Sequence, residues 1–255
     1  YHVHPYRWAT IGKEIKHIED ATMEDVKAFF HRFYLPSNAI MVVAGNVKHD
    51  DVKRLAEKWF APIPSGKRPE RKTIVEPEQT EPRRSTVHRD VPSDAIHKVY
   101  HMAARMDKEY HAQDLLSDVL GRGQSSRFYN ALVKDRQLFT DLSAHVSGSF
   151  EKGLFVISGR LRNGVKPEDA EAGIQSEISR LLNEGITEQE LSKVKNKAES
   201  THVFGEVSVL NKAMNLAFGE LLGDIEMVNT EIARLQAVTV TDVMQAAKSI
   251  LREEN

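Results

Sequence analysis

The chain has 255 residues, of which 40% are hydrophobic and 28% are charged, a balance typical of a globular protein. Its formal net charge of -2 gives no general attraction to nucleic acid or anionic membranes, and no apolar run approaches the ~20 residues that a membrane span needs. The absence of cysteine excludes disulfides, thiolate metal sites and cysteine nucleophiles, and it leaves cytoplasm and periplasm equally open as the compartment.

The first segment carries signals for two helices with a strand between them. Thr22 and Asp25 fit a capping box, and Val26 begins an apolar stripe at helical spacing. This helix should end before the next proline, because proline cannot continue it. Residues 38–47 form a nearly continuous apolar run, which predicts a buried strand. Residues 49–59 have the spacing of an amphipathic helix.

A stretch rich in proline, glycine and charged residues, 63–82, predicts a linker that divides the chain. After it, the pattern predicts strands first and helices later. The expected elements are strands at 86–91 and 95–103, helices at 108–120 and 125–134, a hairpin of 142–148 with 153–161, and helices over 166–251. This order predicts an α+β fold, in which helices pack on one face of a mostly antiparallel sheet.

Two short segments resemble each other. Residues 21–30 and 238–247 share a threonine at the cap position, then Asp-Val three and four residues later, then an apolar stripe. The first copy leads into the predicted strand at 38–47, whereas the chain ends where the matching strand of the second copy would begin. The chain also opens at Tyr1 without an initiator methionine. We therefore expect it to be a piece of a longer protein, open at both ends.

The eleven histidines are candidate metal ligands. Neither H-x-x-E-H nor H-E-x-x-H occurs in the sequence. His97 and His101 lie in a predicted strand, where a separation of four residues places them ~13 Å apart, too far for one ion. His2 and His4 are ~7 Å apart at the backbone of an extended segment, so chelation is conceivable there. A hydrogen bond from His4 that fixes the turn at Pro5 is the alternative.

Three stretches carry a resemblance to a known family. They are His-Pro-Tyr-Arg at 4–7 followed by Ile-Gly at 11–12, the run 34–46, and the glycine-containing loop and helix start at 120–129. Together they resemble the pitrilysin/insulinase (M16) family of zinc peptidases. The resemblance implies the LuxS/M16-type metallopeptidase fold, with a partial first domain and most of a second domain of the same type.

Domain limits follow from the resemblance. Residues 1–62 would be the C-terminal part of the first M16-like domain, 63–82 the linker, and 83–255 the second domain without its last strand. In this family two such domains close around a chamber that admits peptides. The first domain carries zinc and the general base, and the second supplies the opposite wall. The chain would therefore be the C-terminal, truncated portion of a zinc metalloendopeptidase that acts in proteolysis.

The resemblance also suggests which residues line the chamber. At two positions the sequence differs from the family pattern. The candidates are Gly121, Arg122, Gly123, Arg136 and Thr140. The loop at 121–123 has two alternative interpretations, a structural turn that caps the next helix and a phosphate-binding loop. Its glycine spacing does not fit a P-loop. Many M16 peptidases have an arginine and, seven positions later, a tyrosine that hold substrate; here Val133 and Thr140 stand at those positions.

No catalytic residue and no metal ligand is assigned to this chain, which is predicted to be inactive alone. Zinc is expected in the full-length protein only. The expected partners are peptide substrates and the missing N-terminal part, a second M16-like subunit or another copy of the chain; neither nucleic acid nor a membrane is expected. The alternative function is a non-catalytic M16-like subunit or scaffold that partners an active subunit, and the two departures favour it.

Overall fold

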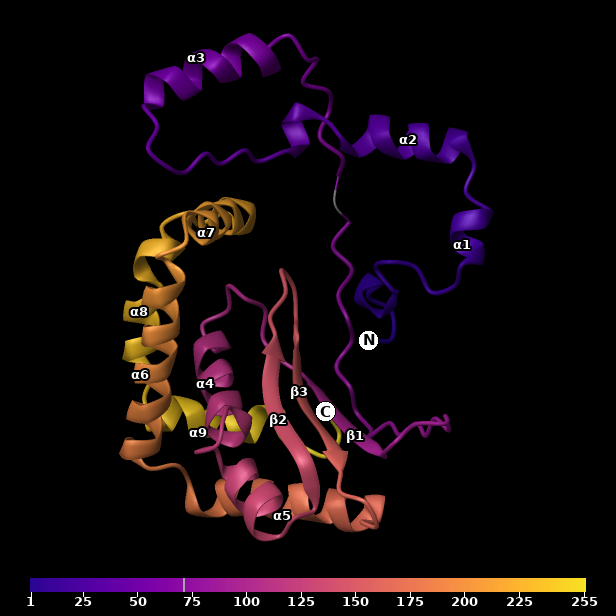
Figure 1. Ribbon diagram of the computed structural model, residues 1–255, viewed down its shortest axis with the longest axis vertical. Coiled ribbons are helices and arrows are strands. Elements are labelled where there is room, and N and C mark those ends of the chain that lie inside the picture. Colours follow the sequence, from indigo (N-terminus) through magenta and orange to yellow (C-terminus); the bar gives the residue numbers. More distant parts are fainter. Residues whose placement is uncertain (71) are drawn as a thin grey trace. The chain divides into compact units, whose positions relative to one another are not determined.

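The structure is a computed structural model that describes residues 1–70 and 72–255. Contacts divide the described chain into two units, drawn in Figure 1. Unit 1 comprises residues 1–77 and 205–228, and unit 2 comprises residues 78–204 and 229–255. The domain limits at 62 and 83 stay a prediction.

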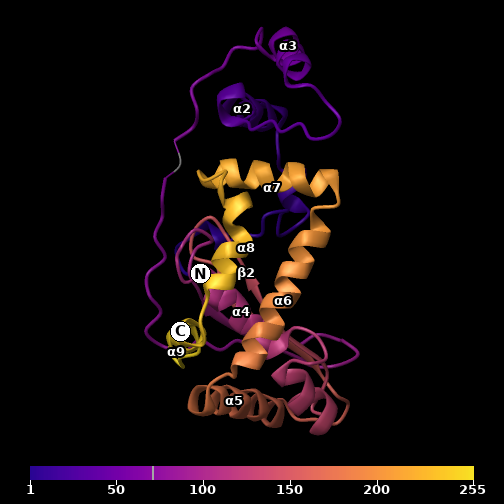
Figure 2. The same ribbon diagram turned by 90° about the vertical axis from the view of Figure 1, so that its left-hand side faces the viewer.

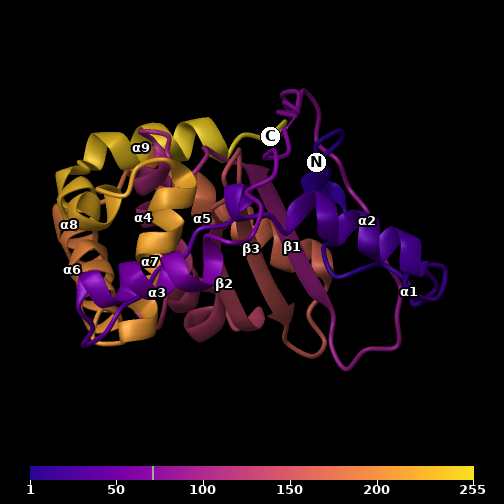
Figure 3. The same ribbon diagram turned by 90° about the horizontal axis from the view of Figure 1, so that it is seen from above.

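Unit 2 is built on a three-stranded antiparallel sheet. Its strands are β1 (Ala95–His101), β2 (Phe139–Ser147) and β3 (Leu154–Leu161), in the order β1-β3-β2. Figure 3 shows them side by side. Burial alternates along β3, where Phe155, Ile157 and Leu161 are buried, so one face of the sheet is covered. The strand at 95–103 and the hairpin predicted from the sequence are confirmed.

Helices that pack on this sheet or on one another complete the core of unit 2. They are α4 (Tyr110–Gly121), the π-helix η3 (Tyr129–Asp135), α5 (Pro167–Glu184), α6 (Glu188–Gly205), α8 (Met227–Ala237) and α9 (Val240–Ile250); α6 and α8 each extend into unit 1. α4 packs on β2 and on α9, and Figure 2 shows it beside β2. The largest fully buried side chains include Phe128, Leu132, Phe139, Phe155, Ile157, Ile174, Ile178 and Leu181. The predicted α+β fold with an antiparallel sheet is therefore confirmed.

Unit 1 consists of short helices joined by extended chain. It contains the 3-10 turns η1 (Pro5–Arg7) and η2 (Pro36–Asn38) and the helices α1 (Lys16–Glu19), α2 (Met23–Phe33), α3 (His49–Phe60) and α7 (Val209–Leu222). The capping box of Thr22 and Asp25 is present, as the sequence predicts. The buried Glu76 carboxylate accepts backbone N–H groups from residues 2–4, and this contact holds the first residues against the linker.

Two predicted strands are wrong in this structure. Residues 39–44 are extended but form no strand, and Met41 and Val43 are exposed rather than buried. The same holds for residues 86–91, where Val87 is exposed. An apolar extended run becomes a strand only where a neighbouring strand accepts its backbone hydrogen bonds, and the described sheet pairs only β1, β3 and β2. The predicted helix at 125–134 also differs, because most of it is the π-helix η3.

Candidate functional site

The glycine loop begins where α4 meets the sheet. A Cβ on Gly121 would lie 1.9 Å from the backbone nitrogen of Ala144 on β2, so only glycine allows α4 to end this close to the strand. Gly123 has a φ of +83°, a conformation that other residues rarely adopt. Ser126 closes the turn, since its hydroxyl donates to the carbonyl of Gly123 at 2.7 Å. These contacts are those of a structural turn.

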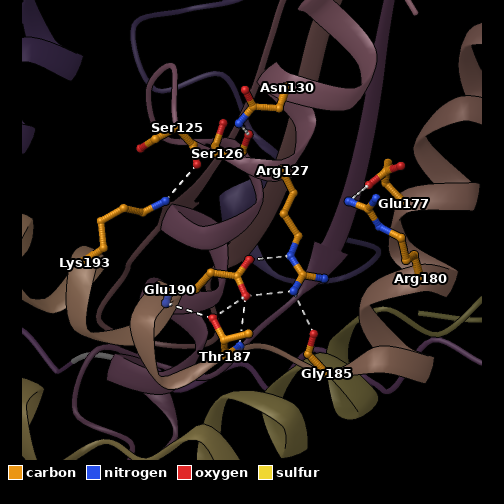
Figure 4. Close-up of polar contacts among 10 residues, drawn as sticks. All are labelled: Ser125, Ser126, Arg127, Asn130, Glu177, Arg180, Gly185, Thr187, Glu190 and Lys193. Carbon is orange, nitrogen blue, oxygen red and sulfur yellow. Dashed lines mark hydrogen bonds and ion pairs between the residues drawn. The ribbon is translucent and has the colours of Figure 1, made fainter. Parts of the chain in front are cut away.

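Basic side chains hold the loop from both ends. The guanidinium of Arg122 bonds both carboxylate oxygens of Asp118, one turn earlier on α4, at 3.2 and 3.1 Å. From α6, the ammonium of Lys193 donates to the carbonyl of Ser125 at 2.7 Å, and that of Lys197 reaches the carbonyl of Arg122 at 3.4 Å. Figure 4 shows the Lys193 contact. Lysines of α6 therefore hold the backbone of the loop, and the loop's arginine is already paired with the carboxylate of Asp118.

The helix after the loop is tied to the start of α6 by an ion pair. Arg127 donates from Nε and Nη2 to the two oxygens of Glu190, at 2.8 and 2.9 Å, and also to the carbonyl of Gly185 at 2.7 Å (Figure 4). Thr187 bonds the same carboxylate and caps α6. These bonds, chiefly that of Arg127, lower the pKa of Glu190 to about 2. This ion pair was not predicted from the sequence, although Thr187-x-x-Glu190 is a capping-box pattern.

Replacing Arg127 with methionine is expected to lower the free energy of unfolding by about 1 to 2 kcal/mol at pH 7, because Glu190 loses its bidentate partner. The loss is not larger because solvent partly screens the Glu190 carboxylate. A carboxylate whose folded pKa is depressed contributes stability above its unfolded pKa of 4.5, and this is lost as the pH falls towards 2. Urea unfolding at pH 7 and pH 3 measures both effects. The control is Arg160→Met, whose pair with Asp141 is exposed. Equal losses in the two variants would contradict the expectation.

The π-helix η3 holds the first of the two departures from the family pattern. Its i to i-5 bonding is seen where the N–H of Arg136 donates to the carbonyl of Ala131 at 3.0 Å. Val133 is half-buried and packs against the core of unit 2. It offers an apolar contact where an arginine would offer donors. Arg136 is exposed, and its Nη1 lies 3.6 Å from the position of a Cβ on Gly173 of α5.

Thr140, the second departure, lies on β2 and is exposed. Its hydroxyl donates to the carbonyl of Arg160 on the neighbouring strand at 3.2 Å. The five candidate residues thus fall into separate places: Gly121, Arg122 and Gly123 form one loop, Arg136 lies beside α5, and Thr140 takes part in cross-strand bonding. Within the residues that the structure describes, no hydrogen bond or ion pair joins Arg136 or Thr140 to that loop. Their role in lining a chamber stays a prediction.

A second polar cluster, missed by the sequence analysis, lies along α4. Asp114 and Asp118 are four residues apart on this largely buried helix. Nearby, the guanidinium of Arg105 donates to Glu231 of α8 at 2.6 Å. Burial, followed by the charge of Asp118, raises the pKa of Asp114 to about 6. The repeated carboxylate at i and i+4 on an apolar helix is the signal that could have found this cluster.

Two of the histidines considered from the sequence make other polar contacts. Nδ1 of His97 lies 3.0 Å from the hydroxyl of Ser158, and Nδ1 of His4 accepts the N–H of Tyr6 at 3.1 Å, which fixes the turn at Pro5 as the sequence suggests. Over residues 1–70 and 72–255, no group of three or more His, Cys, Asp or Glu side chains could hold a metal ion. These residues therefore do not fit zinc as a resident ion.

Comparison with known families and structures gives one consistent result. Residues 20–198 match the model of the peptidase M16 inactive domain. A crystal structure of a protease from Helicobacter pylori aligns over 98% of the chain and 61% of its own, with a TM-score of 0.88 and 26% identity. A peptidase M16 inactive domain from Pseudomonas fluorescens aligns over 100% of this chain and 60% of its own, with a TM-score of 0.83; at 22% identity it supports the fold alone.

Among the curated relatives, zinc protease PqqE from Helicobacter pylori is 27% identical over 259 residues, which cover 99% of this chain. An uncharacterized zinc protease from Streptomyces coelicolor, SCO5738, is 24% identical over 242 residues. The chain spans 57% and 51% of the lengths of these two relatives. Separately, none of the helices in the described part of the chain is both long and apolar enough to cross a membrane.

Proposed function

This chain belongs to the M16 peptidase family, and on that premise we propose that it forms the half of an M16 zinc endopeptidase that holds no zinc and supplies one wall of a peptide-binding chamber. The observation that carries the proposal is the match to the inactive-domain model over residues 20–198. The histidine contacts support it, since the described residues do not fit zinc. Zinc would then be bound by a second M16 half, which supplies the metal chemistry.

Within this proposal, the chain's own residues build and orient the wall. Gly121 lets α4 end against β2, and the lysines of α6 fix the loop that follows. The ion pair of Arg127 with Glu190 holds the start of the next helix to α6. Gly121, Arg122, Gly123, Arg136 and Thr140 remain the proposed chamber-lining residues. Their task is to bind and position peptide, and none of them is proposed to transfer a proton.

A non-catalytic subunit or scaffold is the second candidate function, and one observation favours it. Val133 packs against the core, and the Thr140 hydroxyl bonds across the sheet. Neither side chain presents the donors with which an arginine and a tyrosine would hold substrate. A chain of this kind would keep the fold and the pairing of halves without contributing to peptide binding.

Peptide hydrolysis tests the two functions against each other. A short, unstructured fluorogenic peptide is incubated with this chain, with the zinc-binding M16 half of the same organism, and with both. We expect hydrolysis to need both, because each contributes one wall. A mixture that associates but hydrolyses no faster than the zinc-binding half alone would instead identify the chain as a non-catalytic subunit. Hydrolysis by this chain alone, abolished by a zinc chelator, would overturn both functions.

A further inference from the structure

The turn between η3 and β2 has an unusual backbone conformation. Among the described residues other than glycine, only Gln137 has a positive φ, of 54°. A residue with a Cβ rarely adopts this left-handed conformation, and it does so where the surrounding contacts hold it there. The turn follows the π-helix η3, and the strand after it, β2, begins with an irregularity of its own. Three departures from regular backbone geometry therefore meet in this short segment.

Arg162, which follows the last residue of β3, holds the turn with both its backbone and its side chain. Its N–H donates to the carbonyl of Leu138 at 3.0 Å, and its Nη1 donates to Oε1 of Gln137 at 2.8 Å. From the other side, the N–H of Leu138 donates to the carbonyl of Leu132 in η3 at 2.8 Å. We call the contact of Gln137 with Arg162 the brace. Its donor is charged, and such hydrogen bonds are stronger than those between neutral groups.

The irregularity in β2 is a β-bulge at Thr140. The pairing of β2 with β3 skips this residue, which has no partner on β3. Successive side chains of a regular strand alternate between the two faces, so residues three positions apart point to opposite faces. The extra residue explains why Phe139 and Leu142 are both buried, while Thr140 and Asp141 are both exposed.

The bulge brings three polar side chains together at the surface. The hydroxyl of Thr140 donates to the carbonyl of Arg160 at 3.2 Å and lies 3.3 Å from Oδ2 of Asp141. Nε of Arg160 donates to the same Asp141 oxygen at 2.6 Å. Thr140 is one of the proposed chamber-lining residues. Its position depends on where β2 begins, and the turn at Gln137 sets that point.

We propose that Gln137 and Arg162 are positioning residues, whose brace fixes the turn and thereby places the bulge and the side chain of Thr140 for contact with peptide. This rests on the proposed function, because it assigns the two residues to the wall of the peptide-binding chamber. Neither residue touches the peptide, since the brace acts through the backbone of residues 138–140. Without the brace, the helix and the sheet remain, but this short stretch is held less firmly.

Peptide hydrolysis by this chain mixed with the zinc-binding M16 half of the same organism tests the positioning role. Gln137→Gly removes the side chain and still allows the left-handed φ, and Arg162→Met removes the donor. We expect each variant to raise KM about three- to tenfold and to change kcat less, because the wall binds peptide and holds no reacting group. Gln137→Glu keeps the acceptor and should retain the original KM. Because the two side chains form one contact, the double variant should raise KM no further than either single variant.

A purely structural turn would give a different result. Glycine relieves the left-handed backbone, so Gln137→Gly would then be at least as stable as the unmodified chain and would keep its KM. The matched control is Arg54→Met, which removes an exposed arginine of α3 and should leave KM unchanged. Urea unfolding of every variant checks that it folds. Unchanged KM in both single variants, or increases that multiply in the double variant, would overturn the proposal.

Hydrogen exchange of this chain alone distinguishes failure of the brace from failure of the proposed function. We expect the amides of residues 138–141 to exchange faster in both single variants, and those of residues 143–147 to exchange as in the unmodified chain. Unchanged exchange at 138–141 would overturn the brace, whatever the mixture hydrolyses. Faster exchange with unchanged KM would overturn the positioning role and leave the proposed function standing. Faster exchange in a mixture that hydrolyses no peptide would overturn the proposed function, and the positioning role with it.

Discussion

Replacing Gly121 with alanine is expected to lower the free energy of unfolding by about 3 kcal/mol, because the added Cβ has no room. It would lie 1.9 Å from the backbone nitrogen of Ala144 and 2.6 Å from the carbonyl carbon of Ser143. Both are backbone atoms of β2, so relief requires α4 or the strand to shift rather than a side chain to rotate. Urea unfolding followed by circular dichroism measures the loss.

The matched control for this substitution is Gly205→Ala. Gly205 ends α6, and the nearest atom to its added Cβ is 3.9 Å away, an ordinary contact distance. We expect this change to leave stability within about 1 kcal/mol of the unmodified chain. A Gly121→Ala variant as stable as the Gly205→Ala variant would show that α4 does not end against β2 as described.

Replacing Asp114 with asparagine is expected to change the free energy of unfolding in a pH-dependent way. Relative to the unmodified chain, the variant should be about 2 kcal/mol more favourable at pH 7.5 than it is at pH 4. Burial and the charge of Asp118 raise the folded pKa of Asp114 from 3.8 to about 6. A carboxyl group with a raised folded pKa stabilises the fold fully below its unfolded pKa, and this contribution is lost as the pH rises through 6. Asparagine stays neutral and escapes that loss.

Thermal or urea unfolding of both proteins between pH 4 and pH 7.5 measures this difference. Arg105 and Arg122 are present in both, so their attraction to the charged Asp114 is already included in its pKa. The control is Asp90→Asn, which changes an exposed aspartate. Parallel stability curves for the Asp114→Asn variant and the unmodified chain would contradict burial of the charged carboxylate.

The sequence predicted those elements whose signal lies in residues close together along the chain. The capping boxes that begin at Thr22 and Thr239 could be predicted, because both partners of a capping box lie within four residues. The hairpin of β2 and β3 was readable because its alternation matches a sheet covered on one face. Residues 38–47 have a strand's composition, but composition does not supply a neighbouring strand, so the expected strand did not appear.

The candidate site was predictable to a smaller extent. The loop at 121–123 was found from its glycines, and the structure gives Gly121 a steric reason that no spacing could reveal. The pair of Arg127 with Glu190 joins residues that are 63 positions apart, and sequence patterns at helical or strand spacing do not detect such a distance. The high pKa of Asp114 was equally hidden, since it depends on how deeply α4 is covered.

Metal analysis of this chain tests most directly whether it is the half without zinc. The purified chain is dialysed against buffer with trace zinc, and its metal content is measured by atomic absorption alongside that of the zinc-binding half. We expect this chain to retain far less than one zinc per molecule, because no group of three or more His, Cys, Asp or Glu side chains among its described residues could hold the ion. About one tightly held zinc per chain would contradict the account, because it would require a set of ligands of the kind that a catalytic zinc site has.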